Sequence, residues 1–196
     1  MRTDSPSLAP YLRSQSQARL LAELLLKPET SKSVTELAQI VGAPQSVVSK
    51  EVSRLVKAQV LTDQRIGRTR LVRANPEYRL MAPLVEILST TFGPEPVLSQ
   101  LLMDVQHIDT AFIYGSWADR FNGTDGRPPG DVEVLVVGSP DRATLNATEQ
   151  AAEHALGLPV QITRVSSAAW QKASEPFIKT VRQKPLVALR LERELA

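Results

Sequence analysis

Hydrophobic and polar residues follow two different periods within the first 76 residues. Apolar residues recur every three to four positions, as on one face of a helix, in residues 14–26, 33–41 and 44–58. Shorter apolar runs at residues 60–63 and 71–74 are typical of strands, and a basic turn over residues 64–70 joins them. The pattern predicts three helices followed by a β-hairpin.

Residues with known capping preferences bound these helices. Ser33 stands where an N-cap is expected, and Glu36 three residues later completes a capping box. Gly42 supplies a turn, and Pro44 suits the first position of the next helix. Two helices joined by a short glycine-containing turn indicate a helix-turn-helix.

The pattern after residue 76 changes to an alternation of helices and strands. Helices are expected over residues 77–91, 97–105 and 142–156, and the segment from residue 176 to 191 should begin as a helix. Strands are expected over residues 110–114, 132–137 and 160–165, with a polar loop at 119–130. We predict an α+β two-domain protein, whose second domain is an α/β fold with a small mixed sheet.

Charge is distributed unevenly along the chain. Residues 1–79 carry 13 Lys and Arg against 7 Asp and Glu, whereas residues 80–196 carry 10 against 14. A basic half joined to an acidic half favours two modules with different partners. We expect a DNA-binding domain over residues 1–76, a connecting helix and linker over 77–96, and a second domain over 97–196.

Composition excludes several kinds of site. The chain has no cysteine, which rules out disulfides, thiolate metal sites and cysteine nucleophiles, and only two histidines, His107 and His154. Its apolar runs are too short to cross a bilayer, so no membrane partner is expected. The first ten residues have no apolar signal core, and we therefore expect a cytoplasmic protein.

The third helix and the hairpin carry the residues expected to contact DNA. If Val48, Val52 and Leu55 face the core, a polar face lies opposite them. Short polar groups on such a face can meet base edges, and cations can meet phosphates. The candidates on the helix are Gln45, Ser46, Ser49, Lys50, Ser53 and Arg54. The candidates on the hairpin are Arg65, Arg68, Thr69, Arg70 and Arg73.

Residues 33–76 resemble the ArsR/MarR-type winged helix of transcription regulators. The resemblance implies a winged helix-turn-helix that binds double-stranded DNA, and a homodimer that recognises a palindromic site. It implies no cofactor for DNA binding. The arsenic-sensing branch of these regulators uses cysteine ligands, so sensing through thiolates is excluded for this chain.

A second group of candidate residues lies in the acidic half. Gly115 and Ser116 follow a predicted strand, where a backbone cradle can approach phosphate. Asp131 and Glu133 are one residue apart at the start of the next strand, so both side chains point to the same face. Such a pair can hold a divalent metal through oxygen ligands.

This arrangement resembles the minimal nucleotidyltransferases of the polymerase-beta superfamily over residues 97–165. The resemblance implies that Gly115 and Ser116 contact nucleotide phosphates, and that Asp131 and Glu133 bind magnesium. Active members carry a third carboxylate on a following strand. The corresponding positions here are Gln161 and Thr163, neither of which can act as a carboxylate base.

Two functions remain open from the residues. The first is a dimeric DNA-binding transcription regulator whose inactive nucleotidyltransferase-like domain serves sensing, dimerisation or binding of a nucleotide or protein, with residues 77–91 as transmitter. The alternative is an active, magnesium-dependent nucleotidyltransferase, related to toxin–antitoxin pairs, that the winged helix targets. The missing third carboxylate favours the regulator, and we expect no enzymatic activity.

Overall fold

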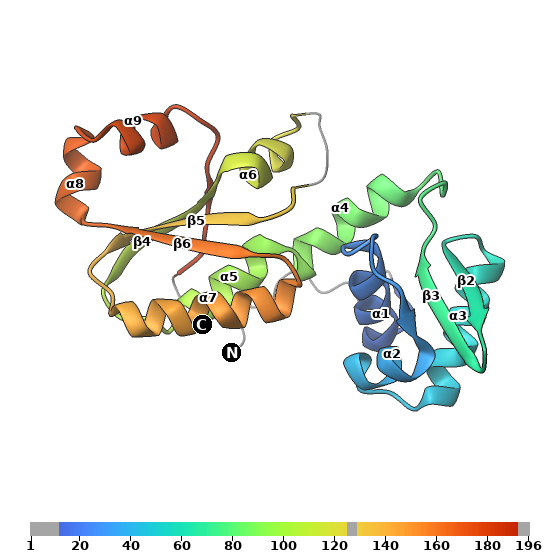
Figure 1. Ribbon diagram of the computed structural model, residues 1–196. Coiled ribbons are helices and arrows are strands. Elements are labelled where there is room, and N and C mark those ends of the chain that lie inside the picture. The colour runs from blue at the N-terminus through green and yellow to red at the C-terminus, as the bar shows by residue number, and fades with distance from the viewer. Residues whose placement is uncertain (1–11, 125–128, 192–196) are drawn as a thin grey trace. The chain divides into compact units, whose positions relative to one another are not determined.

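The computed structural model describes residues 12–124 and 129–191 and shows a mixed α/β protein (Figure 1). The described chain divides into two compact units between Gly93 and Pro94. The expected linker over residues 77–96 is therefore shared between them, because its helix belongs to the first unit. Residues 125–128, within the expected polar loop, lie outside the described residues. Among the described residues, no helix has the length and apolarity that crossing a bilayer requires.

The first unit contains four helices and a small antiparallel sheet among its described residues. The helices are α1 (Gln15–Leu25), α2 (Val34–Val41), α3 (Gln45–Lys57) and α4 (Met81–Phe92). The strands are β1 (Lys32–Ser33), β2 (Leu61–Ile66) and β3 (Thr69–Ala74), in the order β1-β3-β2. The expected order of three helices and a hairpin is confirmed, and β1 adds a third strand that two residues are too few to reveal in a pattern.

The helix boundaries follow the expected caps. Ser33 and Glu36 form the capping box, with the Ser33 side chain accepting from the Glu36 backbone and the Glu36 side chain accepting from the Ser33 backbone. Gly42 ends α2 in the left-handed region at φ 66°. Pro44 is the N-cap of α3 rather than its first helical residue, one position from the expectation.

The hairpin differs from the expectation in the length of its turn. Ile66 pairs with Thr69, so only Gly67 and Arg68 form the turn, and most of the expected turn over residues 64–70 is strand. Gly67 has φ 59°, a value that glycine adopts without the steric cost of a side chain. The polar and basic residues on either side of this turn therefore belong to paired strands and not to a loop.

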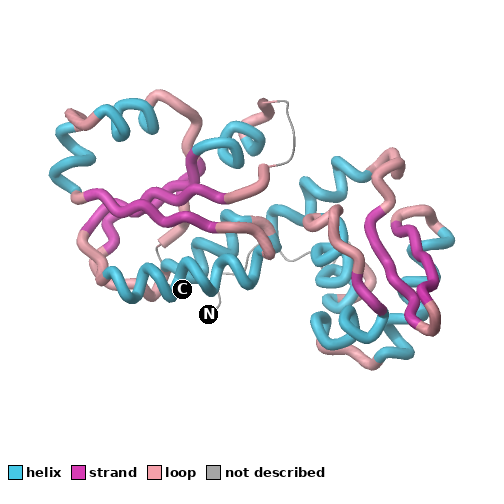
Figure 2. Tube along the Cα trace, in the orientation of Figure 1, coloured by secondary structure: helices cyan, strands magenta, loops and turns pink. Residues whose placement is uncertain are grey.

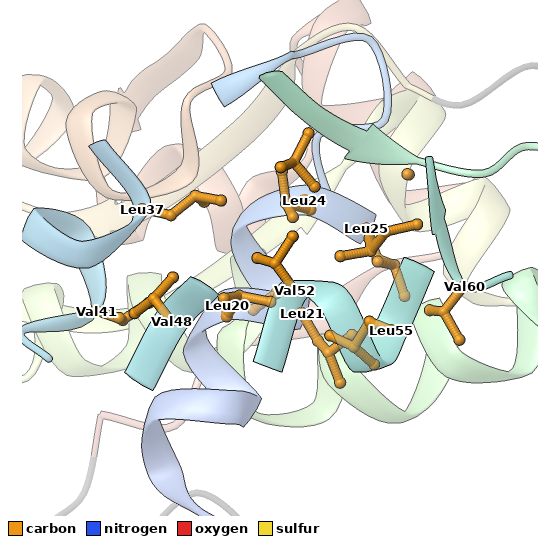
Figure 3. Close-up of a cluster of buried hydrophobic side chains, with 14 of the residues drawn as sticks. Leu20, Leu21, Leu24, Leu25, Leu37, Val41, Val48, Val52, Leu55 and Val60 are labelled. Atoms are coloured by element: carbon orange, nitrogen blue, oxygen red, sulfur yellow. The ribbon is translucent and has the colours of Figure 1, made fainter. Parts of the chain in front are cut away.

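The core of the first unit lies between α1, α2, α3 and the hairpin. Figure 3 shows leucines of α1 packed against Leu37 and Val41 of α2 and against Val48, Val52 and Leu55 of α3. All three residues of the predicted inner face of α3 are buried. The amphipathic pattern therefore placed α3 correctly, with its polar face turned away from the core.

Helix α4 completes this core instead of standing free as a connection. Leu88 is 1% exposed and belongs to the same cluster as the α1 leucines. The helix begins at Met81, four residues later than expected, because Tyr78 and Met81 close turns on the carbonyls of Asn75 and Tyr78. Its apolar residues explain this position, since burying them against α1 removes apolar surface from water.

The second unit is built on a four-stranded sheet in the order β6-β5-β4-β7. The strands are β4 (Ile108–Tyr114), β5 (Val132–Gly138), β6 (Val160–Val165) and β7 (Val187–Ala188). The helices are α5 (Pro94–Leu102), α6 (Gly115–Phe121), α7 (Arg142–Leu156), α8 (Ser167–Lys172) and α9 (Pro176–Arg182). β5 runs parallel to β6 and β4 runs antiparallel to β5 and β7, so the sheet is mixed as expected.

Helices cover both faces of this sheet (Figure 2). Residues of α5 and α7 pack with Val132, Val134 and Val136 on one face, while α8 and α9 pack with Leu135 and Val137 on the other. Coverage on both faces explains why β5 is a continuous apolar run instead of an alternating one.

Two helices of the second unit differ from the expectation. Pro94 begins α5, although the prolines at 94 and 96 were expected to precede the helix; proline is tolerated in a first helical turn because its missing N–H has no partner there. Gly115 begins α6, which takes up residues expected to be loop. Gly115 and Ser116, the residues expected to contact phosphate, therefore lie at the start of a helix.

Candidate nucleic-acid interface

The polar face of α3 is the first part of the candidate interface. Gln45, Ser46, Lys50, Ser53 and Arg54 are exposed, and Ser49 is half-buried. The buried positions Val48, Val52 and Leu55 lie on the opposite side, as helical spacing requires. Lys57 is exposed four residues after Ser53 on the same face; sequence reasoning passed over it although this spacing could have found it.

Three of the α3 candidates are engaged within the protein: Ser53 accepts from the hairpin, and Gln45 and Arg54 have partners on α2 and α3. Arg54 forms a two-point ion pair with Glu51, with Nη2 at 2.5 Å from Oε1 and Nε at 3.2 Å from Oε2. The hydrogen bond to Glu51 raises the pKa of Arg54 above its ordinary value. The Gln45 amide donates to Thr35 Oγ1 of α2 at 3.2 Å, which ties the start of α3 to the preceding helix.

The face of the hairpin that meets α3 carries two opposed arginines. Arg65 and Arg70 are cross-strand partners, and the same face holds the buried residues Val72 and Ala74 further along β3. Arg70 Nε lies 2.6 Å from Asp63 Oδ2, and its Nη1 donates to Ser53 Oγ of α3 at 2.9 Å. The hairpin and α3 are therefore joined by a side-chain hydrogen bond.

The remaining hairpin candidates divide between the tip and the other face. Arg68 and Thr69 are exposed at the turn. Arg73 pairs with Thr62 on the face opposite Arg65 and Arg70, and its Nε donates to Thr62 Oγ1 at 3.4 Å. Strand alternation therefore separates Arg73 from Arg65 and Arg70, although all three lie on the hairpin.

Three of the cations expected from the sequence to contact DNA have no side-chain partner among the described residues. Within residues 12–124 and 129–191, no hydrogen bond or ion pair engages the side chains of Lys50, Arg65 or Arg68. All three are exposed, so their charges are available to an external anion.

A groove of about 290 Å³ borders α3 on the side of α1. Its walls include Arg13 and Gln17 near the start of α1 and Val47, Lys50 and Arg54 of α3. Val47 is 51% exposed.

The candidate residues of the second unit meet at one end of the sheet. Glu133 on β5 is the cross-strand partner of Tyr114 on β4, and a Cβ on Gly115 would overlap with its Oε2 atom. Gly115 has φ 71°, a conformation that favours glycine, whereas the overlapping carboxylate is the far end of a flexible side chain that can shift. The Glu133 carboxylate thus lies against the backbone where a phosphate was expected to approach.

Asp131 and Glu133 are close enough for their charges to interact. Burial raises the pKa of Glu133, and the charge of Asp131 raises it further, while Lys184 lowers it. Burial also raises the pKa of Tyr114, with a smaller lowering from its hydrogen bond to Thr163. Asp131 is exposed, and Ser116 is exposed at the start of α6.

The donor set fits a magnesium ion only in part. Asp131 and Glu133 supply carboxylate oxygens of the kind that magnesium prefers. The cross-strand partner of Glu133 on β6 is Gln161, and Leu135 pairs with Thr163, so neither position adds a carboxylate. Among the described residues, no group of three or more His, Cys, Asp or Glu side chains could hold a metal. A metal-bound nucleotide would also need the Glu133 carboxylate to leave Gly115.

Comparison with known proteins finds a distant structural likeness. No family model matches the chain, and no curated protein matches it. Among solved structures, the chain is similar to BpsR of Bordetella bronchiseptica, whose DNA binding is regulated by 6-hydroxynicotinic acid, with 19% identity and a TM-score of 0.31. The match covers 39% of this chain and 61% of that one. A superposition of this quality decides neither fold nor function.

Proposed function

We propose that the protein is a transcription regulator whose first unit binds double-stranded DNA as a winged helix-turn-helix. In this proposal α2 and α3 form the helix-turn-helix, and the β2–β3 hairpin is the wing. The exposed face of α3 enters the major groove, where Ser46, Ser49 and Lys50 meet base edges and phosphates.

The observation that carries the proposal is the opposition of Arg65 and Arg70. Like charges directly opposite each other on a hairpin destabilise it. Asp63 offsets the charge of Arg70, and Arg65 has no counterpart within the described residues. The Arg65 guanidinium gains a partner when a polyanion lies along this face. Helix α3 presents two further cations, Lys50 and Lys57, to the same polyanion.

The hydrogen bond between the wing and α3 also supports DNA binding. Arg70 donates to Ser53, so the wing and the helix present their polar groups as one surface. The major groove is about 12 Å wide and admits one helix, which leaves the hairpin beside it to follow the backbone or enter the minor groove. As part of the proposal, a homodimer would place two α3 helices one helical turn apart on a palindromic site.

The experiment that tests this function is selection of duplex fragments by the purified chain. The proposal expects enrichment of a sequence with two-fold symmetry, and weaker retention of that sequence by the Ser46→Ala and Lys50→Ala variants. Ser139→Ala, at an exposed serine of the second unit, is the matched control and should retain it fully. Failure of the wild-type chain to retain any duplex would overturn the proposal.

For the second unit we propose a non-catalytic role in sensing, dimerisation or partner binding. Gln161 and Thr163, where active nucleotidyltransferases have a carboxylate, support this role because the acceptor hydroxyl would have no base. Incubation with labelled nucleotides and magnesium tests it directly. No transfer of label is expected, and transfer to any acceptor would establish the enzyme instead.

A further inference from the structure

The groove beside α3 joins that helix to the start of α1. Arg13 lies at the α1 end, and Lys50 and Arg54 lie on the α3 wall, with the buried residues Leu20 and Val48 beneath them. The backbone N–H of Arg13 donates to Gln17 Oε1 at 2.8 Å, which holds this residue at the rim of the groove. The side chain of Arg13 is exposed and takes no part in that hydrogen bond.

The charge of the groove is positive. Three cations line it, and Glu51 is the one carboxylate among its lining residues. Glu51 is already engaged by Arg54 in the two-point ion pair. Arg13 and Lys50 therefore leave a net positive charge in a concave surface, where an anion is attracted more strongly than on a flat one.

The groove and the wing lie on opposite flanks of α3. Val47 and Arg54, seven residues apart, lie on the groove side of the exposed face of α3. Ser53, which accepts from Arg70 of the wing, lies on the other side of that face, and Lys50 lies between the two sides. When α3 occupies a major groove, a phosphate strand runs along each of its flanks.

We propose that the groove between α1 and α3 seats a backbone phosphate of the DNA strand opposite the wing, with Arg13 as its contact from α1. This inference rests on the proposed function. It extends the interface to an element outside the helix-turn-helix and hairpin, and it assigns a role to a cation that the sequence pattern did not single out. A phosphate contact of this kind positions the protein without reading bases.

The test measures duplex affinity of the full chain across a range of salt concentrations, for a selected site and for an unrelated duplex. Each phosphate contact contributes about 0.9 to the slope of log affinity against log salt. Arg13→Ala should flatten the slope by about 0.9 on both duplexes, whereas Arg13→Lys, which keeps the charge, should retain it. Arg19→Ala is the matched control, because Arg19 is an exposed cation of α1 that does not line the groove.

The outcomes separate this inference from the proposed function. If the wild-type chain binds duplex and Arg13→Ala keeps the wild-type slope, the inference is overturned while the proposed function stands. An equal flattening by Arg19→Ala would also overturn it, because the effect would then report total charge and not the groove. If the wild-type chain binds no duplex, both fail. Equal thermal melting of the three variants confirms that the fold is intact.

Discussion

Arg70 Nη1 on the wing donates a hydrogen bond to Ser53 Oγ on α3 at 2.9 Å. Arg70 is at the same time bound to Asp63 Oδ2 at 2.6 Å on the neighbouring strand. Asp63 thus orients a guanidinium that reaches across to the helix, and a side-chain hydrogen bond joins the wing to α3.

Removing the Ser53 hydroxyl should weaken DNA binding without unfolding the protein. Ser53→Ala frees one N–H of Arg70, so the wing loses its link to α3. We expect a loss of about 1 kcal/mol in binding, or roughly fivefold in affinity, with little change in thermal stability because the site is exposed. Fluorescence anisotropy with a labelled duplex measures this. Ser139→Ala, at an exposed serine of the second unit, is the control; an equal loss in both variants would contradict a role for the hydrogen bond from Arg70.

Glycine at position 59 should stabilise the first unit. Gln59 follows α3 with φ 61°, a left-handed conformation that is unfavourable for a residue with a side chain. Gln59→Gly removes that strain and keeps the hydrogen bond from Asn75 Nδ2, which goes to the backbone carbonyl of Gln59. We expect a gain of about 0.5–1 kcal/mol in the free energy of unfolding, measured with denaturant. Gln59→Ala, which retains a Cβ, should gain far less, and an equal gain would argue against strain as the cause.

Glu133→Gln should stabilise the second unit increasingly as pH rises. The folded-state pKa of Glu133 is raised by burial and by Asp131, so the folded protein holds this proton more tightly than the unfolded chain. The stability it contributes is present below the unfolded-state pKa and is lost as pH rises through the raised folded-state pKa. The difference in melting temperature between the variant and the wild type should grow from about pH 4 towards neutrality. A difference independent of pH would contradict it.

Magnesium should stabilise the wild-type second unit only if it occupies the Asp131–Glu133 pair. A ligand that binds the folded state alone raises stability by about 1.4 kcal/mol for each tenfold excess over its dissociation constant. Among the described residues, no third such side chain joins these two carboxylates in a group that could hold a metal. We therefore expect a weak stabilisation, seen at about millimolar magnesium and absent in Asp131→Asn. Tight binding that survives Asp131→Asn would show that the cation lies elsewhere.

The elements with local signals were predictable from sequence. The capping box of Ser33 and Glu36 marks the start of α2, and apolar spacing places Val48, Val52 and Leu55 inside. Helix α7 and strand β6 have the bounds that were expected, because Asp141 and Gly157 cap the helix and the strand is rich in β-branched residues. Local side-chain chemistry decides such boundaries.

Features that depend on tertiary contacts were not predictable. Strand β1 has two residues and exists because β3 offers an edge to Lys32 and Ser33. The pairing of Arg54 with Glu51 was accessible from i, i+3 spacing, yet the link from Arg70 to Ser53 spans 17 positions and has no sequence signature. The contact of Glu133 with Gly115 likewise needs β4 and β5 to be neighbours.

DNA binding by α3 and the wing is tested by the salt dependence of duplex binding by Lys50→Ala/Arg65→Ala. One residue lies on α3 and the other on the wing, and neither has an ion pair among the described residues. We expect the slope of log affinity against log salt to flatten by about 1.8, the contribution of two phosphate contacts. Arg19→Ala/Arg79→Ala, which removes the same charge elsewhere in the first unit, should leave it unchanged. A wild-type slope in Lys50→Ala/Arg65→Ala would contradict the account.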